Sequence, residues 1–112
     1  MFDPGLAERL RDMMGGMLEM ESSHMFGGFG YLMNGHMCVF IWNDHLVIRI
    51  GPEAAEDIKD EPYVGPMDFT GRPMRGWAVV HPDGITEDDQ LQRYVDLAIF
   101  FCAGLLPKEK KT

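Results

Sequence analysis

The chain has 112 residues, a formal net charge of −8 and 25% charged residues. This length accommodates one hydrophobic core, so we expect a single domain over residues 1–107 and a charged tail at 108–112. With 10 basic residues against 18 acidic ones, the chain lacks the clustered Lys and Arg that bind nucleic-acid phosphates. It also lacks a run of about 18 apolar residues and a basic-then-apolar start, so we expect a cytoplasmic protein that makes no membrane contact.

A helix is the first predicted element. Asp3 can accept a hydrogen bond from its first turn, and Pro4 suits the first helical position, where the missing N–H would have no partner. Apolar residues then recur at helical spacing, which predicts one buried stripe: Leu6, Leu10, Met13 or Met14, and Met17.

An antiparallel meander is predicted next. Asn34-Gly35 is the strongest short hairpin signal in the chain, because both residues accept the positive φ of a tight turn, and Asn43-Asp44 is a second turn of this kind. Two-residue turns also define the register of the strands that they join. We therefore expect three strands, at 25–33, 36–42 and 45–51.

Alternation of side chains sorts this meander into two faces. One face is aliphatic and is expected to form the core, with Gly28 and Gly30 allowing a helix to approach closely: Phe26, Leu32, Met37, Val39, Ile41, Leu46, Ile48 and Ile50. The opposite face is too aromatic to be an ordinary solvated surface, and its centre is a candidate interface: Phe29, Tyr31, Phe40, Trp42 and Val47. One of the chain's own helices, a second copy or another protein could cover it, and we favour a symmetric homodimer.

The second half of the chain predicts a short acidic helix, two strands and a final helix. The segments are 52–59, 63–69 and 76–80, and the last helix begins at Thr86, with Asp89 completing a capping box. The resulting order, α-β(3)-α-β(2)-α, describes an α+β domain.

Catalytic and cofactor motifs were sought and not found. His36 and Cys38 lie two residues apart, and His45 falls on the same predicted face but at the far end of the hairpin, so four converging metal ligands are not expected. Cys38 and Cys102 form no CxxC pair and are expected to be free thiols that behave as small apolar residues. We expect no catalytic site, no metal and no cofactor.

Two segments are more distinctive than the rest. The first is Met25-Phe26-Gly27-Gly28, which continues to Tyr31, and the second is Gly71-Arg72-Pro73-Met74, which continues to Trp77. In this order, with the hairpin between them and a helix after them, they resemble the signature of the TfoX N-terminal domain family. The resemblance covers about residues 6–106.

This resemblance implies a fold like that of the type III secretion chaperones, α-β(3)-α-β(2)-α. It also implies kinship with regulators of competence genes, which act in transcription regulation together with the cyclic AMP receptor protein, and it implies no enzymatic activity or cofactor. Full-length regulators carry a second, C-terminal domain. Family members often have Arg or Lys before the first segment, where this chain has His24. Arg72 can serve either a structural or a ligand-contacting role.

Two functional hypotheses follow. The first is a non-enzymatic protein-interaction domain that acts as a homodimer and contacts a regulatory protein. The alternative is a small-molecule or peptide-binding module that uses the aromatic sheet face. An uncharacterised enzyme is a third reading, for which no catalytic constellation is visible.

Overall fold

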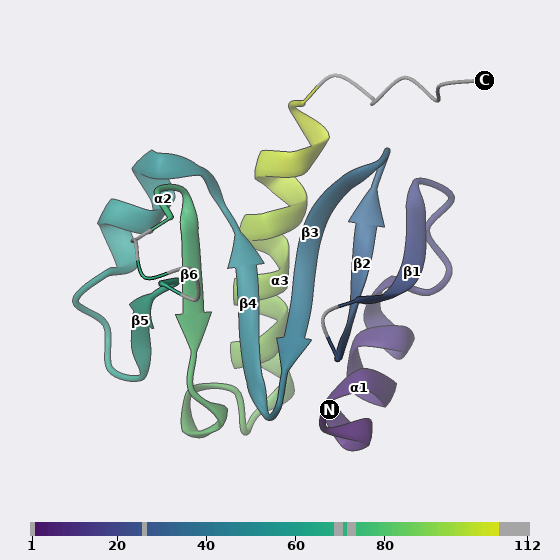
Figure 1. Cartoon of the computed structure of the whole chain (residues 1–112), viewed down its shortest axis with the longest axis horizontal. Helices are drawn as coiled ribbons and strands as arrows, with labels where there is room; N and C mark the ends of the chain where they lie inside the picture. Colours follow the sequence, from purple (N-terminus) through teal and green to yellow (C-terminus); the bar gives the residue numbers. More distant parts are fainter. Residues whose placement is uncertain (1, 26, 69–70, 72–73, 106–112) are drawn as a thin grey trace.

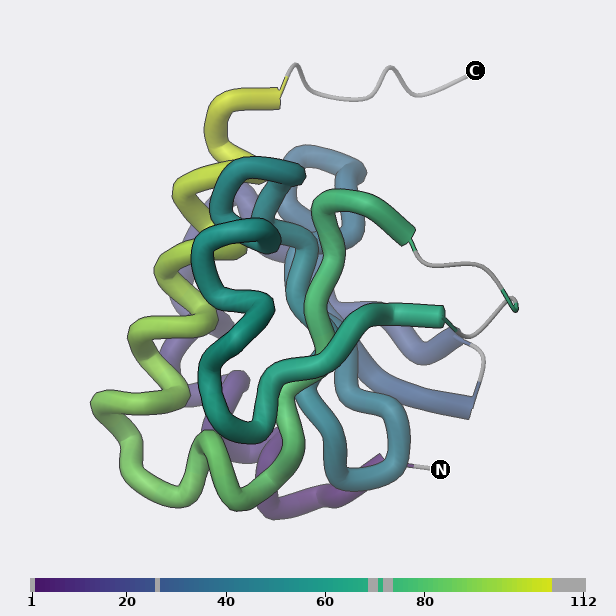
Figure 2. The backbone as a smooth tube through the Cα atoms, turned by 90° about the vertical axis from the view of Figure 1, so that its left-hand side faces the viewer, coloured from purple at the N-terminus to yellow at the C-terminus, as the bar shows by residue number. Residues whose placement is uncertain are grey.

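The computed structural model describes residues 2–25, 27–68, 71 and 74–105. Its elements are α1 (Pro4–Met14), β1 (Met20–Met25), β2 (Gly28–Met33), β3 (His36–Trp42), β4 (His45–Arg49), α2 (Gly51–Ile58), β5 (Val64–Pro66), β6 (Trp77–Val80), the 3-10 turn η1 (Pro82–Gly84) and α3 (Asp88–Ala103). The strands form one six-stranded sheet in the order β1-β2-β3-β4-β6-β5, and every pairing is antiparallel (Figure 1). Helices α1 and α3 pack on one face of this sheet, and α2 lies on the same side, next to β6 and α3 (Figure 2).

The α+β class and the meander packed by helices are confirmed. Both hairpin turns form as predicted, with Asn34, Gly35 and Asn43 at positive φ. The sheet has one strand more than expected, because the chain turns at Gly27, also at positive φ, and β1 pairs along the whole of β2. This edge strand is polar and partly exposed, so it carries no hydrophobic alternation that would reveal it.

Local capping explains where the two long helices begin. The Asp3 carboxylate accepts the Gly5 N–H at 3.0 Å, and Pro4 opens α1 as predicted. The capping residue of α3 is Glu87, one residue after the predicted cap at Thr86. Its N–H donates to Gln90 Oε1 at 3.0 Å. The capping box is therefore formed by Glu87 and Gln90, not by Thr86 and Asp89.

A β-bulge in β3 determines which residues of β2 reach the core. Tyr31 lies opposite Val39, but the next residue, Leu32, lies opposite Met37, so Cys38 has no partner across the ladder. Cys38 and Val39 are consecutive, and both are fully buried in the core cluster beneath the helices. One extra residue in a strand moves every side chain beyond it to the opposite face of the sheet, relative to the residues of the neighbouring strand.

The bulge leaves intact the prediction for β4 and for β3 from Val39 onward. It makes the prediction wrong for β2 and for Met37, which pairs with Leu32 and is only partly buried, outside the core cluster. The other expected core residues of β3, of β4 and of the position after β4 are buried: Val39, Ile41, Leu46, Ile48 and Ile50. Phe29 and Tyr31 join them, each 4% exposed, because they pair with Ile41 and Val39. Leu32, Gly28 and Gly30 consequently face away from the helices. Phe26 lies outside the described residues.

A charged clamp ties the loop after α2 to α3. Two Arg93 nitrogens donate to the two carboxylate oxygens of Glu61 at 2.8 and 2.6 Å, and the Tyr94 hydroxyl donates to Glu61 at 2.8 Å. Hydrogen bonding from Arg93, helped by Tyr94, lowers the pKa of Glu61 to about 2, although desolvation opposes the shift. The clamp therefore favours the folded state only while Glu61 is ionised.

This clamp predicts a pH-dependent loss of stability. The pKa of Glu61 is about 2 in the folded chain and 4.5 ordinarily, so its contribution is complete above pH 4.5 and disappears as the pH falls toward 2. Because Arg93 is half exposed, we expect Glu61→Gln to cost only about 1 kcal/mol at pH 7 and almost nothing near pH 2. Urea unfolding between pH 7 and 2.5 measures this. Glu53→Gln, on the exposed side of α2, is the control and should change stability by under about 0.5 kcal/mol at any pH. An equal loss at all pH values would contradict the assignment.

Candidate functional site

The face of the sheet opposite the helices is the candidate site, and we call it the open face. Its centre is the cross-strand pair Phe40 and Val47, and Val79 lies next to Val47 on β6. Phe40 is 5% exposed and Val47 is 0% exposed, yet neither belongs to the core cluster beneath the helices. Within the described part of the chain no helix lies over this face (Figure 2).

Phe40 lies across the two glycines of β2. A Cβ on Gly28 would overlap the Phe40 ring and the carbonyl oxygen of Ile41, and a Cβ on Gly30 would overlap the carbonyl oxygen of Val39 and crowd the Phe40 backbone. The glycines thus allow close packing, as the sequence indicated, but they admit an aromatic side chain on the open face. The expectation that a helix approaches the sheet closely at these two glycines is therefore wrong.

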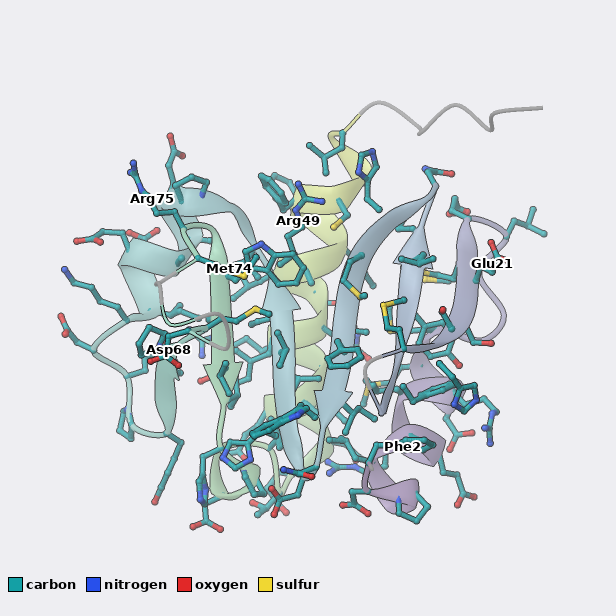
Figure 3. The ribbon with its side chains drawn as sticks, viewed as in Figure 1. Phe2, Glu21, Arg49, Asp68, Met74 and Arg75 are labelled. Atoms are coloured by element: carbon teal, nitrogen blue, oxygen red, sulfur yellow. The ribbon has the colours of Figure 1, made fainter. Side chains whose placement is uncertain are left out.

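Two tryptophans extend the apolar surface on either side of its centre. Trp42 ends β3, is 41% exposed and lies opposite His45. Trp77 begins β6 and lies opposite Arg49, whose guanidinium carbon is 5.7 Å from the Trp77 ring centroid and 5.7 Å from that of Phe101. These contacts hold the Arg49 charge at the upper end of β4 rather than at the centre of the face (Figure 3).

The five predicted interface residues therefore separate into two groups. Phe40, Trp42 and Val47 lie together on the open face. Phe29 and Tyr31 lie on the helix face, where the Phe29 ring is 5.5 Å from Tyr31, 5.4 Å from Phe2 and 5.1 Å from His24, so their assignment to the interface is wrong. The face also includes Trp77 and Val79, which the sequence analysis left out because it derived no pairing between β4 and β6.

The two signature segments flank the open face. Met25, Gly27 and Gly28 form the turn region between β1 and β2, while Gly71 and Met74 belong to the connection between β5 and β6. In Figure 2 the described ends of both segments lie on the side opposite the helices, and in Figure 1 they stand toward opposite ends of the strand order. Phe26, Arg72 and Pro73 lie outside the described residues. Segments about 45 residues apart in the chain thus border one surface.

Histidines gather at the lower end of this face without forming a metal centre. The rings of His45 and His81 are 5.1 Å apart, and His45 Nδ1 is 2.8 Å from Asp44 Oδ1. With Tyr63 and Val79 they line a shallow hollow of about 490 Å³. The described residues contain no group of three His, Cys, Asp or Glu side chains placed to hold a metal ion.

A second depression lies between α2 and the β5–β6 pair. It has a volume of about 370 Å³ and is lined by apolar side chains and by cations, with acidic residues beside them. Its principal lining residues are Pro52, Ala55, Lys59, Pro66, Met74, Arg75 and Trp77. Trp77 belongs to the open face as well, so the two surfaces adjoin.

The packing of Phe40 against β2 predicts that the open face tolerates no side chain at Gly30. We expect Gly30→Ala to destabilise the chain by about 2–3 kcal/mol, because the new Cβ meets backbone atoms that cannot rotate away. Gly65→Ala is the matched control on β5, since a Cβ there has nothing within 4 Å, and it should change stability by under about 0.5 kcal/mol. Urea denaturation measures both variants. Equal stability of the two would show that Gly30 does not pack closely on the backbone of β3.

Comparison with known proteins identifies the family. The model of the TfoX N-terminal domain matches residues 12–101, which includes both signature segments and all six strands. Neither the curated proteins nor the solved structures contain a match to this chain. Among the described helices, none combines the length and apolar character needed to cross a membrane. Since the match extends over most of the sequence, the chain belongs to the TfoX N-terminal domain family.

Proposed function

We propose that this chain is a non-enzymatic protein-interaction domain that uses the open face as its contact surface and pairs there with a second copy of itself. The observation that carries the proposal is the set of partly exposed apolar side chains on the open face, Trp42, Trp77 and Val79, around the buried pair Phe40 and Val47. An apolar surface of this kind is typical of protein contact sites, and aromatic residues and methionine are enriched in the cores of interfaces.

The distribution of charge supports a second copy as the partner. The chain carries a net charge of −8, so two copies repel each other unless their acidic residues stay apart. Among the described residues of β3, β4 and β6 that share the face of Phe40 and Val47, none is acidic. Glu21 lies on the edge strand β1, away from the centre (Figure 3). Two copies can therefore meet through their centres without placing carboxylates against each other, as a symmetric contact requires.

Family membership supports a regulatory role for such a contact. The resemblance implies regulators of competence genes that work with a partner at promoters, and the acidic charge of this chain favours a protein partner over direct contact with DNA. We propose that the domain contributes to transcription regulation through protein contacts.

The alternative is a peptide or small-molecule binder. The depression between α2 and the β5–β6 pair favours it, because Pro52, Pro66 and Met74 give an apolar floor beside the cations of Lys59 and Arg75. In this case the ligand would contact Trp77 at the margin of the open face, and the chain would stay monomeric.

Sedimentation velocity distinguishes the two functions. We expect the wild-type chain to form a dimer at micromolar concentration and Trp42→Glu to weaken the dimer at least about tenfold, which is about 1.4 kcal/mol, because the new carboxylates oppose each other. Phe100→Glu is the matched control: Phe100 is an aromatic residue on α3 that is 86% exposed, and its replacement should leave the dimer intact. A wild-type chain that stays monomeric at high micromolar concentration would rule out the dimer and leave the depression beside α2 as the contact surface.

A further inference from the structure

Two buried thiols that are distant in the sequence meet inside the fold. Cys38 is the unpaired residue of the bulge in β3, and Cys102 lies in the last turn of α3. Both side chains are 0% exposed, and Cys102 Sγ lies 3.5 Å from the carbonyl oxygen of Met37, the residue before Cys38, so the two thiols are neighbours in the core. The sequence analysis treated them as separate apolar residues, so the structure assigns them a relationship that their spacing did not indicate.

The surrounding groups orient the pair. Cys102 Sγ is 3.5 Å from the carbonyl oxygen of Met37 and 3.9 Å from that of Arg49, so its S–H has carbonyl acceptors on both β3 and β4. The Cys38 thiol, on the residue that follows Met37, can then donate to the Cys102 sulfur. The bulge is necessary for this arrangement, because it places Cys38 as well as Val39 on the helix face.

We propose that Cys38 and Cys102 form a redox-responsive dithiol that a peroxide converts into an intramolecular disulfide, fastening the last turn of α3 to the bulge of β3. This inference concerns the interior of the domain and does not depend on the proposed function of the open face. Two thiols on neighbouring positions of the core need little rearrangement to bond, provided that local opening at the helix end admits the oxidant.

The electrostatics indicate which thiol reacts first. The hydrogen bond from Cys38 lowers the pKa of Cys102, with a further contribution from the positive charge of Arg49, although burial opposes the shift. The same hydrogen bond, together with burial, raises the pKa of Cys38 well above its ordinary range. The thiolate is the nucleophile, so once local opening frees the Cys102 S–H from its carbonyl acceptors and admits the oxidant, Cys102 ionises more readily and reacts first, and Cys38 is the resolving thiol.

The chemistry balances with hydrogen peroxide as the oxidant. The Cys102 thiolate attacks one peroxide oxygen, the S–O bond forms, the O–O bond breaks, and the released hydroxide takes up a proton to leave as water. The Cys38 sulfur then attacks the Cys102 sulfenic acid, forming the S–S bond and breaking the S–O bond, and a second water leaves with the Cys38 proton. Both sulfur atoms are oxidised and both peroxide oxygens are reduced to water.

Oxidation of the purified full chain tests the proposal. After treatment with hydrogen peroxide at neutral pH, we expect a thiol assay in denaturant to fall from two free thiols to none. Peptide mapping should recover Cys38 joined to Cys102 within one chain. The oxidised protein should melt at least about 5 °C higher than the reduced protein, because the bond restrains the unfolded chain between these residues.

Single cysteine variants test the order of the steps. In Cys38→Ser, a sulfenic acid should accumulate at Cys102 and react with a dimedone probe, whereas Cys102→Ser should leave Cys38 unlabelled. Alanine replacements repeat the comparison if either serine variant fails to fold. A wild-type chain that keeps both thiols under conditions that fully oxidise glutathione would overturn the proposal, as would a disulfide that forms only between chains. Labelling of Cys38 in place of Cys102 would overturn the assigned order.

Discussion

The bulge at Cys38 is the constraint on which the rest of the structure depends. Without it, the turn at Asn34-Gly35 would place Phe29 and Tyr31 on the face of Phe40. With it, these two aromatic residues move under the helices and complete the core with Val39 and Ile41. A single extra residue thus determines the composition of both faces of the sheet. It also turns the Cys38 thiol toward α3.

The composition of the open face follows from this register. Gly28 and Gly30 now face Phe40, and the missing side chains leave a strip of bare backbone on which the ring can lie. Phe40 in turn shields Val47, which helps an apolar centre to remain buried without a covering helix. This packing accounts for Gly28 of the first signature segment and for Gly30 two residues later. They require no bound phosphate and no reacting group.

Charge has a different role in each part of the molecule. The clamp of Glu61, Arg93 and Tyr94 fastens the loop after α2 to α3. Arg49 is held between the rings of Trp77 and Phe101. The acidic excess stays away from the centre of the open face, where a partner would have to desolvate it at a large cost. An acidic domain can therefore present a contact surface that is close to neutral.

The fold class and the two hairpins could be read from the sequence, because helix caps and tight turns depend on a few adjacent residues: Asp3 and Pro4 at a helix start, and Asn34 and Gly35 at positive φ. Residues 28–31 also held a signal for the face of β2, since large side chains alternate there with glycine and only the large ones can fill a core. The polar edge strand β1 gave no pattern to follow. Tertiary structure alone decided three features: the bulge in β3, the position of Trp77 and Val79 next to β4 on the open face, and the proximity of Cys38 and Cys102. They depend on which strands pair and on how much apolar surface the helices can cover, and these are properties of the whole chain rather than of any short segment.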